Sequence, residues 1–201
     1  MNRIQNGKLI VISGPSGAGK STVISKAKAM NHNMRFSVSA TTRSPRPGEQ
    51  DGREYFFVSA ERFGQMIEDG QLLEYASYVG NSYGTPREAI EKMLAEGCDV
   101  VLDIEVQGAA QVKARMPEAI TVFLTSSSFD ELRRRLEGRG TETAERISGR
   151  IARAREELKE VVNYDYIVIN DDPDIAAKEL CSIIMAEKCR TADRIKLLEE
   201  C

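Results

Sequence analysis

A glycine-rich run between an apolar stretch and a helix-forming segment limits this chain to a small set of folds. The run Gly14-Pro15-Ser16-Gly17-Ala18-Gly19-Lys20-Ser21 matches G-x-x-x-x-G-K-[ST], with Thr22 next. An apolar strand candidate, 9–12, precedes it, and a predicted helix runs from Lys20 to about Met30. Such glycines let backbone N–H groups face phosphate oxygens, and the helix start adds its positive dipole end. An incidental glycine-rich turn is disfavoured by this context, so we predict a nucleoside triphosphate site.

Two side chains of this loop and one acid elsewhere are candidates for phosphate and metal binding. Lys20 would reach the β- and γ-phosphates, and the Ser21 hydroxyl would ligate Mg²⁺. Asp103 ends a second apolar run, where parallel sheets place their ligands, and would hold Mg²⁺ through water. The alternative for Asp103 is a carboxylate hydrogen-bonded to backbone at a strand end.

Apolar runs and helical segments alternate along much of the chain. Further buried strands are predicted at 100–104, 121–124 and 166–169. Capping signals begin three helices, at Thr85-Pro86-Arg87-Glu88, at Ser128-Phe129-Asp130-Glu131 and at Asp172-Pro173. This alternation predicts an α/β fold with a parallel sheet and helices on both faces.

Composition indicates which partners this protein lacks and in which compartment it is expected. The chain has 201 residues, 41% of them hydrophobic and 29% charged, with a net charge of −3. That charge argues against nucleic-acid partners, and no apolar run reaches the roughly 18 residues of a membrane helix. The start of the chain has no apolar signal core. Four cysteines without a CxxC pair fit a reducing compartment. We expect a cytoplasmic protein that binds neither nucleic acid nor membrane, and its oligomeric state is left open.

Two stretches interrupt the alternation of strands and helices. Residues 36–83 are rich in Ser, Thr, Arg, Pro, Gly and Tyr, with short strand candidates at 36–39 and 55–58. Within them Arg43 and Arg46, three apart in a proline-stiffened loop, and Tyr55 would suit a dianionic monophosphate. Residues 133–155 hold eight arginines. The helical stripe that follows consists of Ile147, Ile151, Leu158 and Val162.

The stretch Ser39-Ala40-Thr41-Thr42-Arg43-Ser44-Pro45-Arg46-Pro47-Gly48-Glu49 closely resembles the guanylate kinase family. Further matches follow in family order: Gly52-x-x-Tyr55-x-Phe57-Val58, Leu73-Glu74-Tyr75, Tyr83-Gly84-Thr85, Leu102-Asp103-Ile104-Glu105-Val106-Gln107-Gly108, and Leu136-Glu137-Gly138-Arg139-Gly140-Thr141-Glu142. The resemblance runs from the phosphate loop to about Asp172. It implies one domain, 1–201, with a P-loop kinase core at about 8–35, 86–130 and 160–201. A small mixed α/β GMP-binding insertion at about 36–85 and a helical, arginine-rich lid at about 131–159 complete it.

The resemblance also implies transfer of the γ-phosphoryl group of Mg·ATP to GMP, and to dGMP as well, in purine nucleotide recycling and GTP supply. The acceptor phosphate would be held by Arg43, Arg46, Tyr55 and Tyr83, and guanine read by Ser39, Glu74, Thr85 and, least securely, Glu105. One carboxylate, Glu74, can accept from both guanine N1–H and N2–H₂, whereas adenine offers no such donor pair. On local sequence Thr85 fits a helix N-cap equally well.

The resemblance assigns the lid arginines Arg135, Arg139 and Arg150 to the phosphates of ATP, and places Asn170 near adenine. These arginines, with Lys20 and Arg43, would carry the catalysis, because phosphoryl transfer needs positioning and charge stabilisation. The other arginines of this stretch are interpreted as a solvated helix face: Arg133, Arg134, Arg146, Arg153 and Arg155.

Three other functions remain to be weighed against this one. A kinase for another monophosphate would share the phosphate loop, but Glu74 with Ser39 favours guanine. A non-catalytic guanylate-kinase-like binding module would resemble the fold, although such modules usually have degraded phosphate loops. A P-loop ATPase acting as a switch has no supporting motif here, and the NKxD motif by which GTPases read guanine is absent from the sequence.

Overall fold

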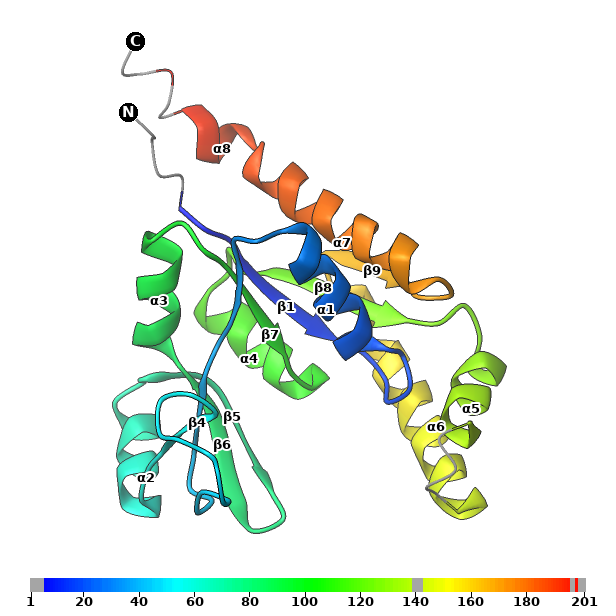
Figure 1. Ribbon diagram of the computed structural model, residues 1–201, viewed down its shortest axis with the longest axis horizontal. Coiled ribbons are helices and arrows are strands. Elements are labelled where there is room, and N and C mark those ends of the chain that lie inside the picture. The colour runs from blue at the N-terminus through cyan, green and yellow to red at the C-terminus, as the bar shows by residue number, and fades with distance from the viewer. Residues whose placement is uncertain (1–5, 139–142, 196–197, 199–201) are drawn as a thin grey trace.

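The computed structural model describes residues 6–138, 143–195 and 198, and its centre is a five-stranded parallel sheet. The strand order is β2-β7-β1-β8-β9 (Figure 1). The strands are β1 (Leu9–Ser13), β2 (Met34–Phe36), β7 (Asp99–Asp103), β8 (Ile120–Thr125) and β9 (Tyr166–Ile169). The predicted α/β class with a parallel sheet is confirmed. β1 lies between β7 and β8, so the chain connections on its two sides run in opposite directions across the sheet. Parallel sheets of this kind bind ligands at the carboxyl ends of the strands at such a point, which is where the loop after β1 lies.

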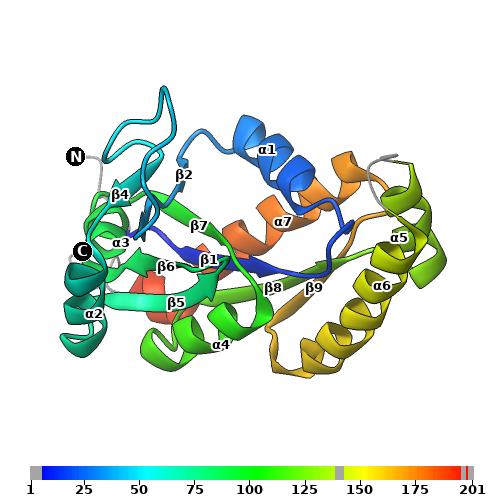
Figure 2. The ribbon, with the colours of Figure 1, turned by 90° about the horizontal axis from the view of Figure 1, so that it is seen from below.

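Helices cover both faces of this sheet, which explains why its central strands are continuously apolar. Ile10 and Ile12 of β1 pack in one core with helices α1, α5, α6 and α7, whereas Leu9 and Val11 face α3 and α4 (Figure 2). Successive side chains of a strand point to opposite faces, so burial on both faces leaves no polar position. These helices are α1 (Lys20–Met30), α3 (Arg87–Ala95), α4 (Val106–Arg115), α5 (Phe129–Glu137), α6 (Ala144–Lys159) and α7 (Pro173–Lys188).

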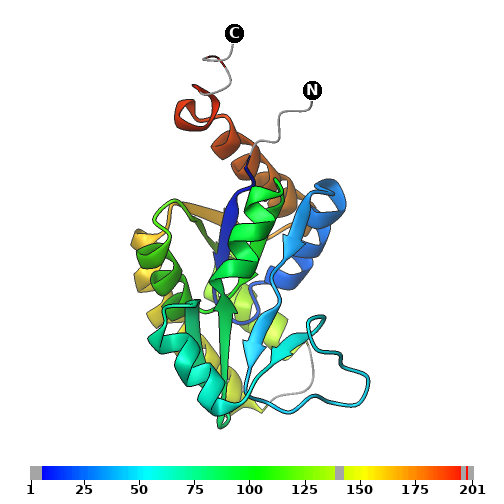
Figure 3. The ribbon, with the colours of Figure 1, turned by 90° about the vertical axis from the view of Figure 1, so that its left-hand side faces the viewer.

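The insertion forms a second, mixed sheet of order β4-β3-β6-β5 with helix α2 against it. Its elements are β3 (Ser39–Thr41), β4 (Tyr55–Phe57), α2 (Ala60–Glu68), β5 (Leu72–Tyr78) and β6 (Asn81–Pro86). The strand expected at 36–39 is wrong: β2 ends at Phe36 in the core sheet, and β3 begins at Ser39 in the insertion. The chain passes between the two sheets there, and Figure 3 shows the insertion at one end of the core.

The arginine-rich stretch forms two helices, α5 and α6, followed by the 3-10 helix η1 (Glu160–Asn163). Ile147 and Ile151 of the expected stripe are buried in the core, and Leu158 is partly buried. Val162 is an error of the prediction, because its side chain is 82% exposed. The helix changes to 3-10 geometry before Val162, and three residues per turn rotate that position away from the core.

Two of the three predicted capping signals are confirmed. The Ser128 hydroxyl accepts from the Glu131 N–H, and the Asp172 carboxylate accepts from the N–H groups of Asp174 and Ile175. The third is wrong, because Thr85 lies within β6 and the N-cap of α3 is Pro86, without a side-chain cap. The last helix is α8 (Thr191–Arg194), and no helix in the described part of the chain is long and apolar enough to span a bilayer.

Candidate functional site

The phosphate loop joins β1 to α1 with its glycines in conformations that other residues avoid. Gly14 has φ 146° and Gly19 has φ 86°, both in the range where a Cβ is strained. A Cβ on Gly14 would overlap the Leu124 carbonyl oxygen, and one on Gly19 would overlap the Asn170 amide. As the N-cap of α1, Gly19 supplies no side-chain cap. The first N–H groups of the helix therefore remain available to an anion.

Lys20 and Asp103 face each other across the mouth of this loop. The Lys20 ammonium donates to the Gly14 carbonyl oxygen at 2.7 Å and lies 3.9 Å from an Asp103 carboxylate oxygen. Partial burial raises the pKa of Asp103, and the Lys20 charge opposes that rise. A hollow of about 340 Å³ is lined by the loop, Ser21 and Asp103. A hydroxyl and a carboxylate beside a phosphate cradle are oxygen donors that suit Mg²⁺, which takes its other ligands from phosphate and water.

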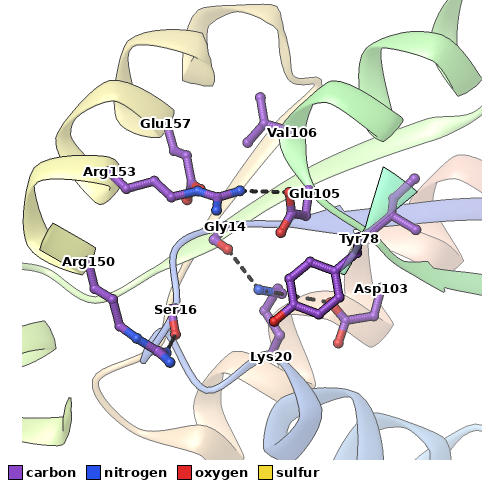
Figure 4. A pocket seen from close by; sticks show the side chains of 11 residues that line it. Gly14, Ser16, Lys20, Tyr78, Asp103, Glu105, Val106, Arg150, Arg153 and Glu157 are labelled. Carbon is purple, nitrogen blue, oxygen red and sulfur yellow. Dashed lines mark hydrogen bonds and ion pairs between the residues drawn. The ribbon is translucent and has the colours of Figure 1, made fainter. Parts of the chain in front are cut away.

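A second cavity, of about 460 Å³, extends from the loop toward helix α6 (Figure 4). Arg150 of α6 donates to the Ser16 hydroxyl of the loop. Arg153 is on an exposed helix face, as expected, with its side chain 61% exposed, and it also lines this cavity, with Glu105 at 2.6 Å and Glu157 at 2.9 Å. The contact with Glu105 was not predicted, because Glu105 lies 48 positions away in the sequence. The available signal was the spacing, since residues three apart share a helix face.

Arg135 connects helix α5 to the phosphate loop. Its guanidinium donates to the Asn170 carbonyl oxygen at 2.7 Å and to the Ala18 carbonyl oxygen at 3.5 Å. It also pairs with Glu131 at 2.7 Å, and hydrogen bonds from Arg134 and Arg135 lower the pKa of Glu131 to about 2. The third lid arginine of the prediction, Arg139, lies outside the described residues.

Asn170 supports the loop from behind. Its side chain is buried after β9, and its amide donates to the Ala18 carbonyl oxygen at 2.7 Å. The side-chain oxygen is buried without a hydrogen-bond partner. Asn170, which the resemblance places near adenine, lies beside the phosphate loop in this structure, and its amide holds the loop backbone.

The predicted phosphate receptor of the insertion is assembled around Arg43. The Arg43 guanidinium lies 5.4 Å from the ring centre of Tyr55, whose ring is 5.9 Å from that of Tyr83 in an edge contact. Glu49, to which the sequence assigned no role, binds Arg43 through both carboxylate oxygens, at 2.9 and 3.0 Å. Both oxygens accept from the same nitrogen, Nη2, while Nη1 of Arg43 donates to the Ser44 carbonyl oxygen at 2.8 Å. Arg46 offers only its backbone N–H to Glu49, and its side chain is exposed.

The predicted base-reading residues meet at a buried carboxylate. Glu74 of β5 is 7% exposed and accepts a hydrogen bond of 2.7 Å from the Thr85 hydroxyl on the paired strand β6. Burial raises the pKa of Glu74, an effect that the Thr85 hydroxyl and Arg115 partly oppose. The Thr85 hydroxyl is therefore committed to Glu74, which resolves the alternative of a helix cap. A carboxylate with one hydroxyl partner keeps acceptor capacity for a ligand.

The other two predicted base contacts, Ser39 and Glu105, lie in different parts of the structure. Ser39 of β3 is half-buried and in register with Tyr55 of β4, within the same sheet. The Glu105 carboxylate is exposed and pairs with Arg153 of α6. The structure thus assembles two groups. One is the phosphate loop with Asp103 and residues of α5 and α6, and the other is the insertion residues around Arg43 and Glu74. Glu105 stands with the first group.

Comparisons with known proteins agree on one family. The guanylate kinase family model matches residues 6–187. The guanylate kinase of Lactococcus lactis subsp. lactis is 51% identical over 95% of this chain and 93% of its own, and that of Desulfitobacterium hafniense is 51% identical over 92% of each. The crystal structure of guanylate kinase from Anaplasma phagocytophilum is similar with a TM-score of 0.72 and 32% identity, over 97% of this chain and 93% of that one.

Proposed function

The chain belongs to the guanylate kinase family, and on that premise we propose that it transfers the γ-phosphoryl group of ATP to GMP through the two groups of residues described above. One observation carries the choice of acceptor: the buried Glu74 carboxylate in hydrogen-bond contact with Thr85. Guanine presents two adjacent donors that one carboxylate can accept together. Adenine would leave the remaining acceptor capacity of this buried carboxylate unsatisfied, which is a strong basis for rejection.

On the ATP side we assign the phosphates to the backbone and side chains of the loop and the adjoining helix start. The residues are Gly14, Pro15, Ser16, Gly17, Ala18, Gly19, Lys20, Ser21 and Thr22, with Asn170 holding the loop from behind. Ser21 and Asp103 would hold Mg²⁺, Asp103 through water. When bound, the ion would neutralise charge on the phosphates.

On the acceptor side we assign the GMP phosphate to Arg43, Arg46, Tyr55 and Tyr83. Glu49 accepts from Nη2 of Arg43 and the Ser44 carbonyl oxygen accepts from Nη1, so a phosphate that binds both nitrogens would displace these two partners. We assign the base to Ser39, Glu74 and Thr85. Glu105 is the weakest of the proposed contacts, since its carboxylate serves Arg153 in this structure.

Catalysis then rests on alignment and charge. Lys20, Arg135, Arg139 and Arg150 would stabilise the negative charge of the transferring group, while Arg43 aligns the acceptor oxygen with it. No covalent intermediate is required. Residues 36–85 act as the acceptor domain and 131–159 as the lid, with the remainder as the core. The free thiols of Cys98, Cys181 and Cys189 favour a cytoplasmic site of action. None of the residues proposed for GMP binding reads the ribose 2′-hydroxyl, so dGMP would also be accepted.

A coupled ADP-release assay tests this proposal. The purified protein is given ATP with GMP, dGMP, AMP, CMP, UMP or dTMP, with Mg²⁺ or with excess EDTA. ADP release that requires Mg²⁺ and either GMP or dGMP is the expected result. Release with another monophosphate would overturn the roles of Ser39 and Glu74. Absence of release from folded, ATP-binding protein would favour a binding module instead.

A further inference from the structure

The turn between β5 and β6 exposes two large apolar side chains in a strained backbone. Tyr78 is 72% and Val79 77% exposed. Tyr78 pairs with Asn81, so Val79 and Gly80 form a two-residue turn with φ of 47° and 74°. Such a turn favours Asn-Gly, and a β-branched residue with positive φ is an outlier. Neither burial nor turn preference accounts for the choice of residues at this position.

Tyr78 projects from this turn into the cavity beside the phosphate loop. Its side chain lines the 460 Å³ cavity together with Lys20, Asp103 and the lid residues Arg150 and Arg153 (Figure 4). Of the eleven described residues around this cavity, Tyr78 alone comes from the insertion. The ring therefore stands where the insertion, the phosphate loop and the lid face one another.

A phenol ring in this position can control access of water. In the proposed reaction an oxygen of the GMP phosphate forms a bond to the γ-phosphorus as the bond to the ADP oxygen breaks. A water oxygen attacking the same phosphorus, with loss of its proton to solvent, gives ADP and inorganic phosphate. Excluding water from a closed site suppresses that side reaction. The acceptor residues assigned within the insertion are absent from the described lining of this cavity, so on the insertion side Tyr78 alone lines it.

We propose that Tyr78 is a positioning residue whose ring covers the phosphoryl-transfer cavity and keeps water from reacting with ATP. This inference rests on the proposed function. The ring acts by its bulk and apolar face, so its hydroxyl is dispensable. Tyr78 would thus reach across from the acceptor domain and form part of the wall of the ATP site.

The test measures ADP and GDP separately, because transfer to GMP forms them in equal amounts and hydrolysis forms ADP alone. In Tyr78→Ala, the rate of ADP formation in excess of GDP is expected to rise about fivefold, a barrier change that these assays resolve readily. Tyr78→Phe keeps the ring and is expected to stay within about twofold of the parent protein. Val79→Asn supplies the residue that the turn prefers and leaves Tyr78 in place, so it serves as the matched control.

Each outcome decides between the alternatives. An unchanged excess of ADP in a folded Tyr78→Ala protein that still forms GDP overturns the role of the ring. An increase as large in Tyr78→Phe or Val79→Asn also overturns it, because the hydroxyl or the turn would then be responsible. If the parent protein forms no GDP at all, the proposed function fails instead. Thermal unfolding of all three variants checks that the hairpin remains folded.

Discussion

The phosphate loop and the insertion both offer positive charge to phosphate, but they are built differently. The loop is one continuous segment whose backbone is set by glycines such as Gly14 and Gly19, and its helix start has no side-chain cap. The insertion relies on side chains from its four strands and from the segment between β3 and β4, where Arg43 binds Glu49, while Glu74 of β5 accepts from Thr85 of β6. The loop therefore offers its backbone to an anion directly, although its Lys20 ammonium is held by Gly14 and Asp103, whereas the insertion offers side chains, of which Arg43 is held by Glu49.

The largest effect is expected in the loop. Lys20→Met removes the ammonium that stands between Gly14 and Asp103, and we expect kcat to fall about a thousandfold, as for loss of a group that stabilises transition-state charge. Lys26→Met is the matched control, because Lys26 pairs with Asp174 on an exposed face of the same helix. Steady-state kinetics with saturating ATP and GMP measure both. A loss below tenfold in Lys20→Met would remove Lys20 from the catalytic group.

The next largest effect is expected in the insertion, and it should change the kinetics with GMP but not the KM for ATP. Glu74→Gln keeps the size of the side chain but cannot accept both guanine donors, so kcat/KM for GMP should fall about a hundredfold. The KM for ATP should stay unchanged, because Glu74 lies in the insertion. Glu68→Gln, at the exposed end of α2, is the control. Full selectivity for GMP over AMP in Glu74→Gln would contradict the assignment of the base site.

Substitution of one glycine in each region tests how strongly the backbone conformation there requires glycine. Gly19→Ala places a Cβ at φ 86° against Asn170, and we expect it to lower the free energy of unfolding by about 1–3 kcal/mol and to weaken ATP binding. Gly64→Ala, in helix α2 with open space around its Cβ position, should raise it by about 0.5–1 kcal/mol. Urea unfolding measures both. Equal effects of the two substitutions would show that the loop backbone is not specially constrained.

The smallest effect is a pH dependence of opposite sign in the insertion and the lid. Burial raises the pKa of Glu74, so between its ordinary and raised values the folded protein binds more protons than the unfolded chain. The contribution of Glu74 to stability is thus present at low pH and falls as pH rises through that window. Glu131 has a pKa of about 2 in the folded protein. Its contribution to stability is therefore present above the ordinary pKa of glutamate and is lost as the pH falls toward 2.

Urea midpoints across a pH series test this pair. Relative to the parent protein, Glu74→Gln should gain stability as pH rises through the window above the usual glutamate range. Glu131→Gln should lose stability relative to the parent as pH rises from about 2 to the usual glutamate range. Parallel pH profiles of the parent and of both variants would rule out the two carboxylates as sources of the dependence.

Local patterns predicted most of the core. The strand before the phosphate loop, the helix Lys20–Met30, the caps at Ser128 and Asp172, and the parallel sheet are all confirmed. Each depends on neighbours within a few residues, either through apolar runs or through capping bonds. The same reasoning failed at Thr85, where a good capping sequence lies inside a strand. There the partner across the sheet, Glu74, outweighed the local preference.

The sequence by itself determined the phosphate loop, the α/β class and, through its ordered motifs, the family. Only the tertiary structure decided which charged side chains form ion pairs, namely Glu49 with Arg43 and Arg153 with Glu105. It also decided that Tyr78 lines the cavity beside the phosphate loop. The physical reason is how far apart in the sequence the interacting residues lie. Backbone conformation and helix capping are set by adjacent residues, whereas buried or paired charges are satisfied by whichever partners the fold brings near, often far away in the chain.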